Sequence, residues 1–468
     1  MECDVIVIGA GPAGLTAALE LTRRHKRVLV LEQGDKVGGI SRTECFRGYR
    51  FDIGGHRFFT QVPEVERLWR DTLGDDLLTV ARQSRIYHRQ RFFSYPIVLS
   101  EALIKLGPIE SLRIIGSYLS ARLAPYHPAT TFEQWVTNRF GRRLYETFFR
   151  GYTEKVWGLP CSSISADWAA QRIQGLSLSS TVMNALTGAT RHKSLIKSFY
   201  YPRLGPGMMW EAFARQASEQ GASVRLCARA VAIDVTQRDR VQVTFEDSGG
   251  REVVTAANVI SSAALPELVA MLQPTPPESV QAAAASFRHR DFILVQLLVR
   301  AERLFSDNWI YVHSPDVRVG RIQNSKNWSR DLVPDAAVTS LGMEYFCSVD
   351  DELWSRDDAA LVELATQELE QLRLARGEQV IDGTVVRQRR AYPVYDSRYA
   401  QSLASVRAYL AGVPSVQTVG RNGMHRYNNL DHSMLTGLLA ARNLDGERHD
   451  LWQVNADASY LEAGPPSV

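Results

Sequence analysis

The sequence has few cysteines and no apolar segment long enough to cross a membrane. No apolar run approaches the roughly 20 residues that a spanning helix needs. The five cysteines are scattered, and no two have the spacing of a metal-ligand pair (Cys3, Cys45, Cys161, Cys227, Cys347). An apolar strand begins four residues into the chain and leaves no room for a signal peptide. These observations predict a protein of a reducing compartment, the cytoplasm, with no metal site and no transmembrane segment.

The sequence also lacks a strong charge imbalance. It has 54 Lys and Arg against 51 Asp and Glu, a net charge of +3, so electrostatics give no reason to expect nucleic acid as a partner. Internal repeats and low-complexity segments are absent too. With 468 residues, of which 45% are hydrophobic and 22% charged, the chain fits a globular protein of two domains.

The first 32 residues show a strand, a glycine turn, a helix and a second strand. An apolar run at 5–8 leads into Gly-x-Gly-x-x-Gly at 9–14, a helical pattern follows at 15–22, and a second apolar run at 28–31 ends at Glu32. This order is typical of a dinucleotide-binding β-α-β unit.

Each position in this unit has a physical role in such a site. Gly9 allows the turn, Gly11 lets a diphosphate approach the backbone, and Gly14 lets the helix pack on the strand. The helix N-terminus, at Pro12 and Ala13, offers N–H groups to the phosphate. Glu32 is placed to accept hydrogen bonds from an adenosine ribose.

A second group of glycines follows the acidic residue. Gly38 and Gly39 precede Ser41 and Arg42, and Arg42 can reach a diphosphate with a charge-assisted bond. Nicotinamide enzymes do not need this second cluster. Another close backbone approach follows at Gly54-Gly55-His56. Either glycine pair could also be an ordinary loop turn.

This order of elements resembles the flavoprotein group that includes amine oxidases, protoporphyrinogen oxidases, phytoene desaturases and UDP-galactopyranose mutases. The resemblance implies an α/β fold with a Rossmann-like domain for non-covalent FAD and a discontinuous, mixed α+β substrate (cap) domain. We expect residues 1–75, 196–265 and 391–468 to form the FAD-binding domain. Residues 76–195 and 266–390 then form the cap.

Later segments fit the same resemblance. Strands near 230–235 and 257–263 would place Val231 beside the adenine and Ser262 at the cofactor. The strand-glycine unit at Gly420-Arg421, with Leu430 and the helix that follows, would reach the flavin end. Four helical patterns are predicted within the cap (101–106, 111–123, 132–149, 357–376). The pattern at 111–123 is amphipathic, and it is more consistent with core packing than with a membrane surface.

Several motifs are similar to those of UDP-galactopyranose mutases. Tyr-Thr-x-Lys-x-Trp-Gly occurs at 152–158, Tyr-Pro at 392–393, and Gly-Arg followed by Arg-Tyr at 420–427. By position, the resemblance implies that His56 faces the flavin and that Trp157 and Tyr392 line the substrate cavity. Arg421 and Tyr427 would lie between flavin and substrate. Each residue also has a structural interpretation, such as a turn cap for His56 or a core ring for Trp157.

The departures from the mutase pattern fall on the groups that hold the substrate diphosphate. The two arginine positions are matched here by Leu176 and Asp291, and a second histidine is replaced by Phe59. An Asp-Met pair is replaced by Asn429-Leu430. The arginines considered as substitutes lie elsewhere in the chain (Arg172, Arg203, Arg288, Arg290). Lys326 could hold a water near the flavin, but a solvated lysine fits its surroundings better.

These residues leave three functions open. The first is an FAD-dependent oxidoreductase that takes a hydride from a small molecule, with a glycosyl or nucleotide-linked substrate suggested by the mutase-like motifs. The second is a redox-neutral, reduced-flavin-dependent nucleotide-sugar mutase. The third is a protein that binds FAD without catalysing a reaction, and it would leave the cap and its polar aromatic residues without a purpose. The missing arginine pair favours the first.

Overall fold

Short apolar runs from several parts of the chain form a parallel sheet, with β1 near the N-terminus as its central strand. The computed structural model describes residues 2–166, 197–237 and 239–455. The sheet has five strands, in the order β20-β13-β1-β2-β9 (Val416–Thr418, Asn258–Ser261, Val5–Ile8, Val28–Leu31, Ser223–Arg225). Strands from distant parts of the chain therefore meet at one carboxyl edge, the usual ligand site in such sheets.

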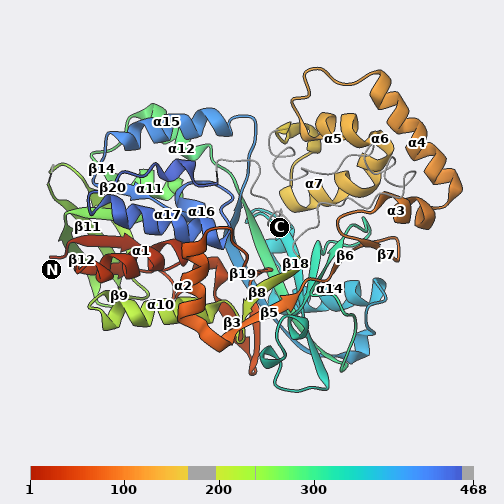
Figure 1. Ribbon diagram of the computed structural model, residues 1–468, viewed down its shortest axis with the longest axis horizontal. Helices are drawn as coiled ribbons and strands as arrows, with labels where there is room; N and C mark the ends of the chain where they lie inside the picture. Colours follow the sequence, from red (N-terminus) through yellow and green to blue (C-terminus); the bar gives the residue numbers. More distant parts are fainter. Residues whose placement is uncertain (1, 167–196, 238, 456–468) are drawn as a thin grey trace.

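Helices cover both faces of this sheet (Figure 1). On one face lie four helices (α1 Pro12–Arg23, α2 Pro63–Leu73, α10 Gly207–Glu219, α17 Leu430–Asn443). On the other lie a four-stranded sheet, β12-β11-β10-β14, and further helices (Gly250–Ala256, Val241–Asp247, Arg229–Asp234, Leu272–Gln273; α11 Leu265–Met271, α12 Glu278–Ala285, α15 Tyr399–Ala411). Trp69 and Trp210 are fully buried where α2 and α10 meet.

A seven-stranded sheet forms the second large unit. Its order is β19-β15-β18-β17-β16-β6-β7 (Val380–Pro393, His289–Arg300, Val338–Cys347, Arg321–Asn324, Trp309–Val312, Ser84–His88, Arg91–Ser94). Helix α14 (Asp358–Gln371) packs on it, preceded by the short α13 (Glu352–Ser355). Two antiparallel pairs complete the strands described: the hairpin β3-β4 and the pair β5-β8, whose strands are distant in the sequence (Thr43–Phe46, Tyr49–Asp52; Leu77–Ala81, Ser198–Pro202).

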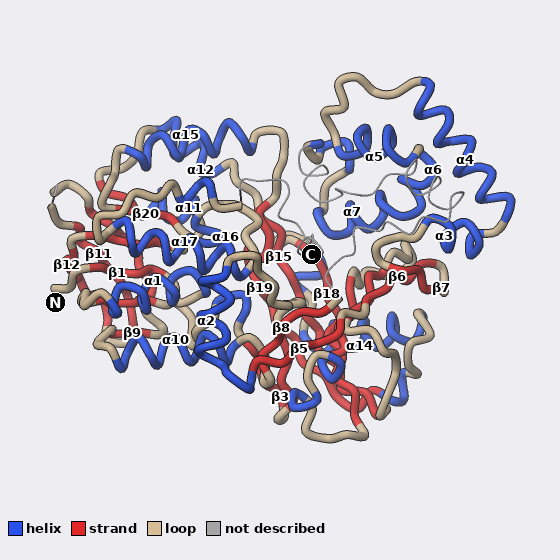
Figure 2. Tube along the Cα trace, viewed as in Figure 1, coloured by secondary structure: helices blue, strands red, loops and turns tan. Residues whose placement is uncertain are grey.

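In the stretch described between residues 99 and 157, five α-helices form a helical part beside this sheet (α3 Leu99–Leu106, α4 Pro108–Leu123, α5 Phe132–Phe140, α6 Arg142–Leu144, α7 Gly151–Trp157). Figure 2 shows this part as helices and loops, apart from the strands. The predicted α/β class is confirmed by these sheets and the helices that cover them. Among the described residues, no helix combines the length and the apolar character needed to span a bilayer.

Three local predictions were wrong. The helix predicted over 132–149 is interrupted at Gly141 (φ +82), where a Cβ would lie 2.7 Å from the backbone nitrogen of Tyr118. The helix predicted over 357–376 ends at Gln371, because Arg373 adopts a left-handed conformation (φ +56). The amphipathic helix at 111–123 does not bury its apolar side, since Leu112 and Leu123 are exposed.

The packing of α17 on α1 generates the first prediction. A Cβ at Gly437 would lie 2.1 Å from the carbonyl oxygen of Ala13, so Gly437→Ala must push the two helices apart. We expect a loss of about 1–3 kcal/mol in the free energy of unfolding, measured by denaturation followed by circular dichroism. Gly116→Ala is the matched control, because a Cβ there meets nothing within 4 Å, and it should be neutral or stabilising. Equal stability of the two variants would contradict this account.

Asp52 generates a prediction about pH. Its carboxylate is buried and accepts a hydrogen bond from the Tyr201 hydroxyl (2.8 Å), and burial raises its pKa from 3.8 to about 8. Between these values the folded state holds a proton that the unfolded chain releases, so Asp52 contributes stability at low pH that is lost as the pH rises toward 8.

Asp52→Asn removes this titration. The free energy of unfolding of the variant should therefore depend less on pH than that of the wild type between the unfolded and folded pKa values of Asp52, measured by denaturant titrations over a pH series. An unchanged pH dependence would show that Asp52 is ionised in the folded protein.

Candidate active site

One large cavity joins the carboxyl edge of the parallel sheet to the helical part and the seven-stranded sheet. Its volume is about 1330 Å³. Nineteen of the 21 residues predicted as cofactor or substrate contacts line it (Gly9, Gly11, Pro12, Ala13, Glu32, Gly39, Ser41, Arg42, Gly54, Gly55, His56, Trp157, Val231, Ser262, Tyr392, Gly420, Arg421, Tyr427, Leu430). Segments far apart in the sequence therefore share one space.

The other two predicted residues, Gly14 and Gly38, lie behind the cavity wall. A Cβ at Gly14 would lie 1.9 Å from the carbonyl oxygen of Gly9, so the absence of a side chain sets the contact between α1 and β1. A Cβ at Gly38 (φ +103) would meet the Trp210 ring at 2.8 Å. Both glycines therefore shape the wall rather than line the cavity.

The glycine turn leaves room for a ligand. A Cβ built on Gly11 would meet only Gly39, at 3.9 Å, so bare backbone faces bare backbone across the gap. The first turn of α1 carries no acidic residue and no side-chain cap. Its N–H groups and positive dipole end therefore point at a space that fits the diphosphate of a dinucleotide.

Glu32 and Arg42 lie on either side of this turn and both already have partners. The two carboxylate oxygens of Glu32 accept hydrogen bonds from the backbone N–H of Ala10 (2.7 Å) and of Gly34 (2.8 Å). Each oxygen keeps a further acceptor site for a ribose hydroxyl. The Arg42 guanidinium pairs with Glu44 (2.6 Å) and donates to the Gln388 side chain (2.9 Å), so these partners hold it in place.

Two further loops at the sheet edge complete the groove. Ser262 follows β13, and its hydroxyl donates to the carbonyl oxygen of Ile8 (2.9 Å), where β1 ends. Gly420 (φ +79) follows β20 and begins α16 (Gly420–Gly423), with its N–H bonded to Thr436 of α17 (3.0 Å). Asn429 and Leu430, at the start of α17, line the same cavity.

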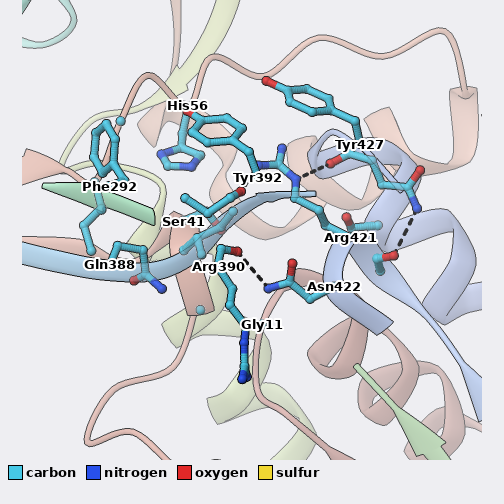
Figure 3. Close-up of a pocket in the computed structure, with 18 of the residues that line it drawn as sticks. Gly11, Ser41, His56, Phe292, Gln388, Arg390, Tyr392, Arg421, Asn422 and Tyr427 are labelled. Atoms are coloured by element: carbon cyan, nitrogen blue, oxygen red, sulfur yellow. Dashed lines mark hydrogen bonds between the residues drawn. The ribbon is translucent and has the colours of Figure 1, made fainter. Parts of the chain in front are cut away.

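Aromatic rings form the far wall of the cavity. The rings of Tyr392 and Tyr427 stack with centroids 5.7 Å apart, and Trp157 lies 6.3 Å from Tyr392 and 6.4 Å from Tyr427. The Arg421 guanidinium lies 4.7 Å from the Tyr427 ring and donates to the carbonyl oxygen of Asn428 (2.9 Å). Figure 3 shows Tyr392 between His56 and Arg421, so side chains from three segments that are distant in the sequence face one space.

The electrostatic field at His56 is positive. Burial, together with the positive charges of Arg421, Arg321 and Arg42, lowers the pKa of His56 from 6.5 to about 3. The imidazole is therefore neutral at physiological pH, with one donor and one acceptor nitrogen. Arg321 is paired with the fully buried Glu344 and donates to the Tyr392 hydroxyl (3.4 Å).

Sequence reasoning missed several residues of the cavity. Arg57 follows His56 directly, so its position beside the glycine pair was the one available signal. Arg321, Trp309, Tyr311 and His313 come from β16, β17 and the segment between them. No local motif marked these residues, because only the pairing of distant strands brings them to the cavity.

The three described arginines that were considered as diphosphate contacts do not line the cavity. Arg290 donates to the carbonyl oxygens of Val156 and Phe346, and Arg203 pairs with Asp76 and Asp331. Arg288 lies on the surface. Arg172 and Leu176 fall outside the described residues.

The sequence-based interpretations of Asp291 and Lys326 also change. Asp291 accepts hydrogen bonds from the backbone N–H of Val349 (2.9 Å) and Arg390 (2.7 Å), and it does not line the cavity. The adjacent Phe292 lines it instead. Lys326 also lies outside the cavity, and its ammonium group donates to backbone carbonyls such as that of Glu302 (2.9 Å) rather than to solvent alone.

Comparisons with known proteins agree on the family. The model of the family "Flavin containing amine oxidoreductase" matches residues 12–444. Coproporphyrinogen III oxidase of Mycobacterium leprae is 26% identical over 447 residues, which cover 89% of this chain and 93% of that protein. A probable UDP-galactopyranose mutase of Klebsiella pneumoniae is 27% identical over 174 residues, 35% of this chain and 43% of that one.

The fold has a solved counterpart. A crystal structure of reduced UDP-galactopyranose mutase superposes with a TM-score of 0.84 at 22% identity, over 97% of this chain and 98% of the other. The match to the family model spans most of the sequence, from Pro12 at the start of α1 to the end of α17, and contains the aromatic wall and the loop at Gly420. The chain therefore belongs to the flavin-containing amine oxidoreductase family, and FAD is its cofactor.

Proposed function

We propose that this protein is an FAD-dependent oxidoreductase that removes a hydride from a small-molecule substrate. The observation that carries the proposal is the single cavity that connects the glycine groove to the aromatic wall. FAD held there without a covalent link supplies the hydride acceptor. The protein contributes binding, orientation and the electrostatic field.

We propose that different ranges of the chain bind the cofactor and the substrate. Residues 1–75, 196–265 and 391–468 hold the cofactor, and residues 76–195 and 266–390 hold the substrate. Support comes from the cavity, which takes its glycine groove from the first set and residues such as Trp157 and Trp309 from the second. His56, Trp157, Tyr392, Arg421 and Tyr427 are the proposed contacts of the substrate at the flavin.

His56 acts in this proposal by hydrogen bonding rather than by proton transfer. Its neutral imidazole, with a pKa of about 3, is too weak a base to accept a proton in the working pH range. It can orient a hydroxyl or carbonyl of the substrate through one nitrogen. The surrounding arginines stabilise negative charge that develops in the same space.

The charge near the cavity favours an anionic substrate, of which a sugar phosphate or nucleotide-linked sugar is one class. The guanidinium groups of Arg57 and Arg82 lie 5.5 and 5.7 Å from the ring of Trp309, a lining residue. Burial lowers the pKa of Arg57, and Arg82 lowers it further. Within the described part of the chain, Nε and Nη2 of Arg82 are buried and have no hydrogen-bond acceptor. A phosphate or carboxylate group would supply one.

A second candidate function is a redox-neutral mutase acting on a nucleotide sugar. The placement of Asp291 favours it, because this carboxylate lies outside the cavity and would not repel a diphosphate. The partial match to the Klebsiella mutase supports the same candidate. In this case Arg57 and Arg321, rather than the arginines of the mutases, would face the anionic group.

We also propose a cytoplasmic location. The five cysteines form no disulfides, and Cys45 and Cys227 are exposed as free thiols. Exposed free thiols are kept reduced in the cytosol.

Anaerobic spectroscopy tests which reaction occurs. Purified protein with bound flavin is mixed without oxygen with a panel of sugar phosphates, nucleotide sugars and their neutral analogues. We expect an anionic member of the panel to bleach oxidised flavin, with recovery of the colour when air is admitted. Boiled protein with added FAD is the control.

The opposite outcome identifies the second candidate. Turnover of a nucleotide sugar only after chemical reduction of the flavin, with no net redox change, would contradict the oxidoreductase and support the mutase. A purified protein that takes up no FAD would contradict both.

Gly11→Val tests the proposed position of the diphosphate. Gly11 has φ −81, which any residue can adopt, and its Cβ would make only an ordinary contact with the protein. We therefore expect the variant to fold with the thermal midpoint of the wild-type apoprotein but to lose bound flavin, measured by absorbance after gel filtration. Gly151→Ala, which meets nothing within 4 Å, should keep its flavin. Flavin retained by Gly11→Val would show that the diphosphate lies elsewhere.

A further inference from the structure

Large apolar side chains on the surface gather on helices α3 and α4 and the loop after them. They form what we call the α3–α4 face (Ile104, Ile109, Leu112, Ile115, Leu119, Leu123, Tyr126). Its most open members, Leu123 and Ile104, are 87% and 81% exposed. Elsewhere in the described chain, large exposed apolar residues occur singly, as at Val253 and Ile381.

The face follows from the sequence of α4. Leu112, Ile115, Leu119 and Leu123 are spaced three or four residues apart and share one side of the helix. The opposite side carries Ile114 and Ala121, which are buried.

The buried side of α4 packs tightly within the helical part. The backbone of Tyr118 approaches Gly141, and the Ser117 hydroxyl accepts a hydrogen bond from the N–H of Arg143 (2.9 Å). The helix is therefore anchored without its apolar stripe. Figure 1 shows α4 at the outer margin of the molecule, on the side away from the parallel sheet. A contiguous apolar surface of this kind marks an interaction site.

The charges around the face are positive. Residues 89–130 contain five Lys and Arg (89, 91, 105, 113, 122) and two acidic residues (101, 110), a net charge of +3. Glu101 pairs with Lys105 and Glu110 with Arg143, so both acids are engaged. Arg113 and Arg122 are exposed beside the apolar stripe.

We propose that the α3–α4 face binds the surface of an anionic lipid bilayer. An amphipathic helix with an apolar stripe and flanking arginines lies in the headgroup region, with its leucines in the acyl boundary and its guanidinium groups on lipid phosphates. A symmetric pair of chains would instead bring the arginines of one face toward the arginines of the other, and the two acids of the face, Glu101 and Glu110, are already paired within their own chain. The observations thus favour a bilayer over a second copy.

Vesicle sedimentation tests this proposal with the full-length, flavin-loaded protein. We expect the protein to sediment with vesicles of equimolar phosphatidylcholine and phosphatidylglycerol, and less with phosphatidylcholine alone. Leu112→Ser combined with Leu119→Ser should weaken binding at least about tenfold, because several CH₂ groups no longer enter the bilayer. Arg113→Gln and Arg122→Gln should each weaken it about fivefold at low salt and reduce the preference for phosphatidylglycerol.

The control is Val253→Ser combined with Ile381→Ser, which removes two exposed apolar residues elsewhere and should leave sedimentation unchanged. Sedimentation that is absent, or that the leucine variant does not change, would overturn the proposal. A concentration-dependent dimer in ultracentrifugation that the leucine variant abolishes would assign the face to a second copy. A fall in thermal midpoint or flavin content of that variant would assign it to the chain's own packing.

Discussion

The site depends on backbone approaches that only glycine permits. Gly14 brings α1 against the carbonyl of Gly9, and Gly437 brings α17 against the carbonyl of Ala13. These contacts set two helix N-termini at the carboxyl edge of one sheet, where β1, β2, β13 and β20 also end. The positive dipole ends, the open gap at Gly11 and the loop at Gly420 therefore converge because two helices pack unusually closely. A bulkier residue at either contact would move the phosphate groove itself.

The second constraint is the concentration of arginine around a space shielded from water. Arg321 is neutralised in part by the buried Glu344, and Arg421 is held by backbone carbonyls; burial is the main reason that His56 stays unprotonated, and the charges of these arginines act in the same direction. Such a field stabilises negative charge whether it belongs to a reduced cofactor or to a substrate phosphate. The field alone therefore does not distinguish the two reactions proposed above, hydride transfer and sugar rearrangement.

The sequence predicted the parts of the site whose requirements are local. A glycine turn after an apolar run, an acid at the end of the next strand and a second glycine pair each act over a few residues, and the structure brings them to one cavity. Residues on long strands were harder to assign, because adjacent side chains point to opposite faces and a motif match that is off by one position selects the wrong face. Asp291 and Phe292 illustrate the alternation: the aspartate stands at the position of a mutase arginine and lies outside the cavity, and the neighbouring phenylalanine lines it. Arg321 carries no local signal, because strand pairing alone brings it to the cavity.

Helix α4 shows a different limit of sequence patterns. A period of three to four residues tells which side chains share a face, and it does not tell whether that face meets the core or the outside. The packed side of α4 is occupied by Ile114 and Ala121, together with Tyr118, whose backbone approaches Gly141. A helix that is anchored by these residues and by a close backbone approach on one side does not need the leucines of its other side for its own packing. Its leucines are then free to serve another contact, and the arginines beside them decide which surface that contact can be.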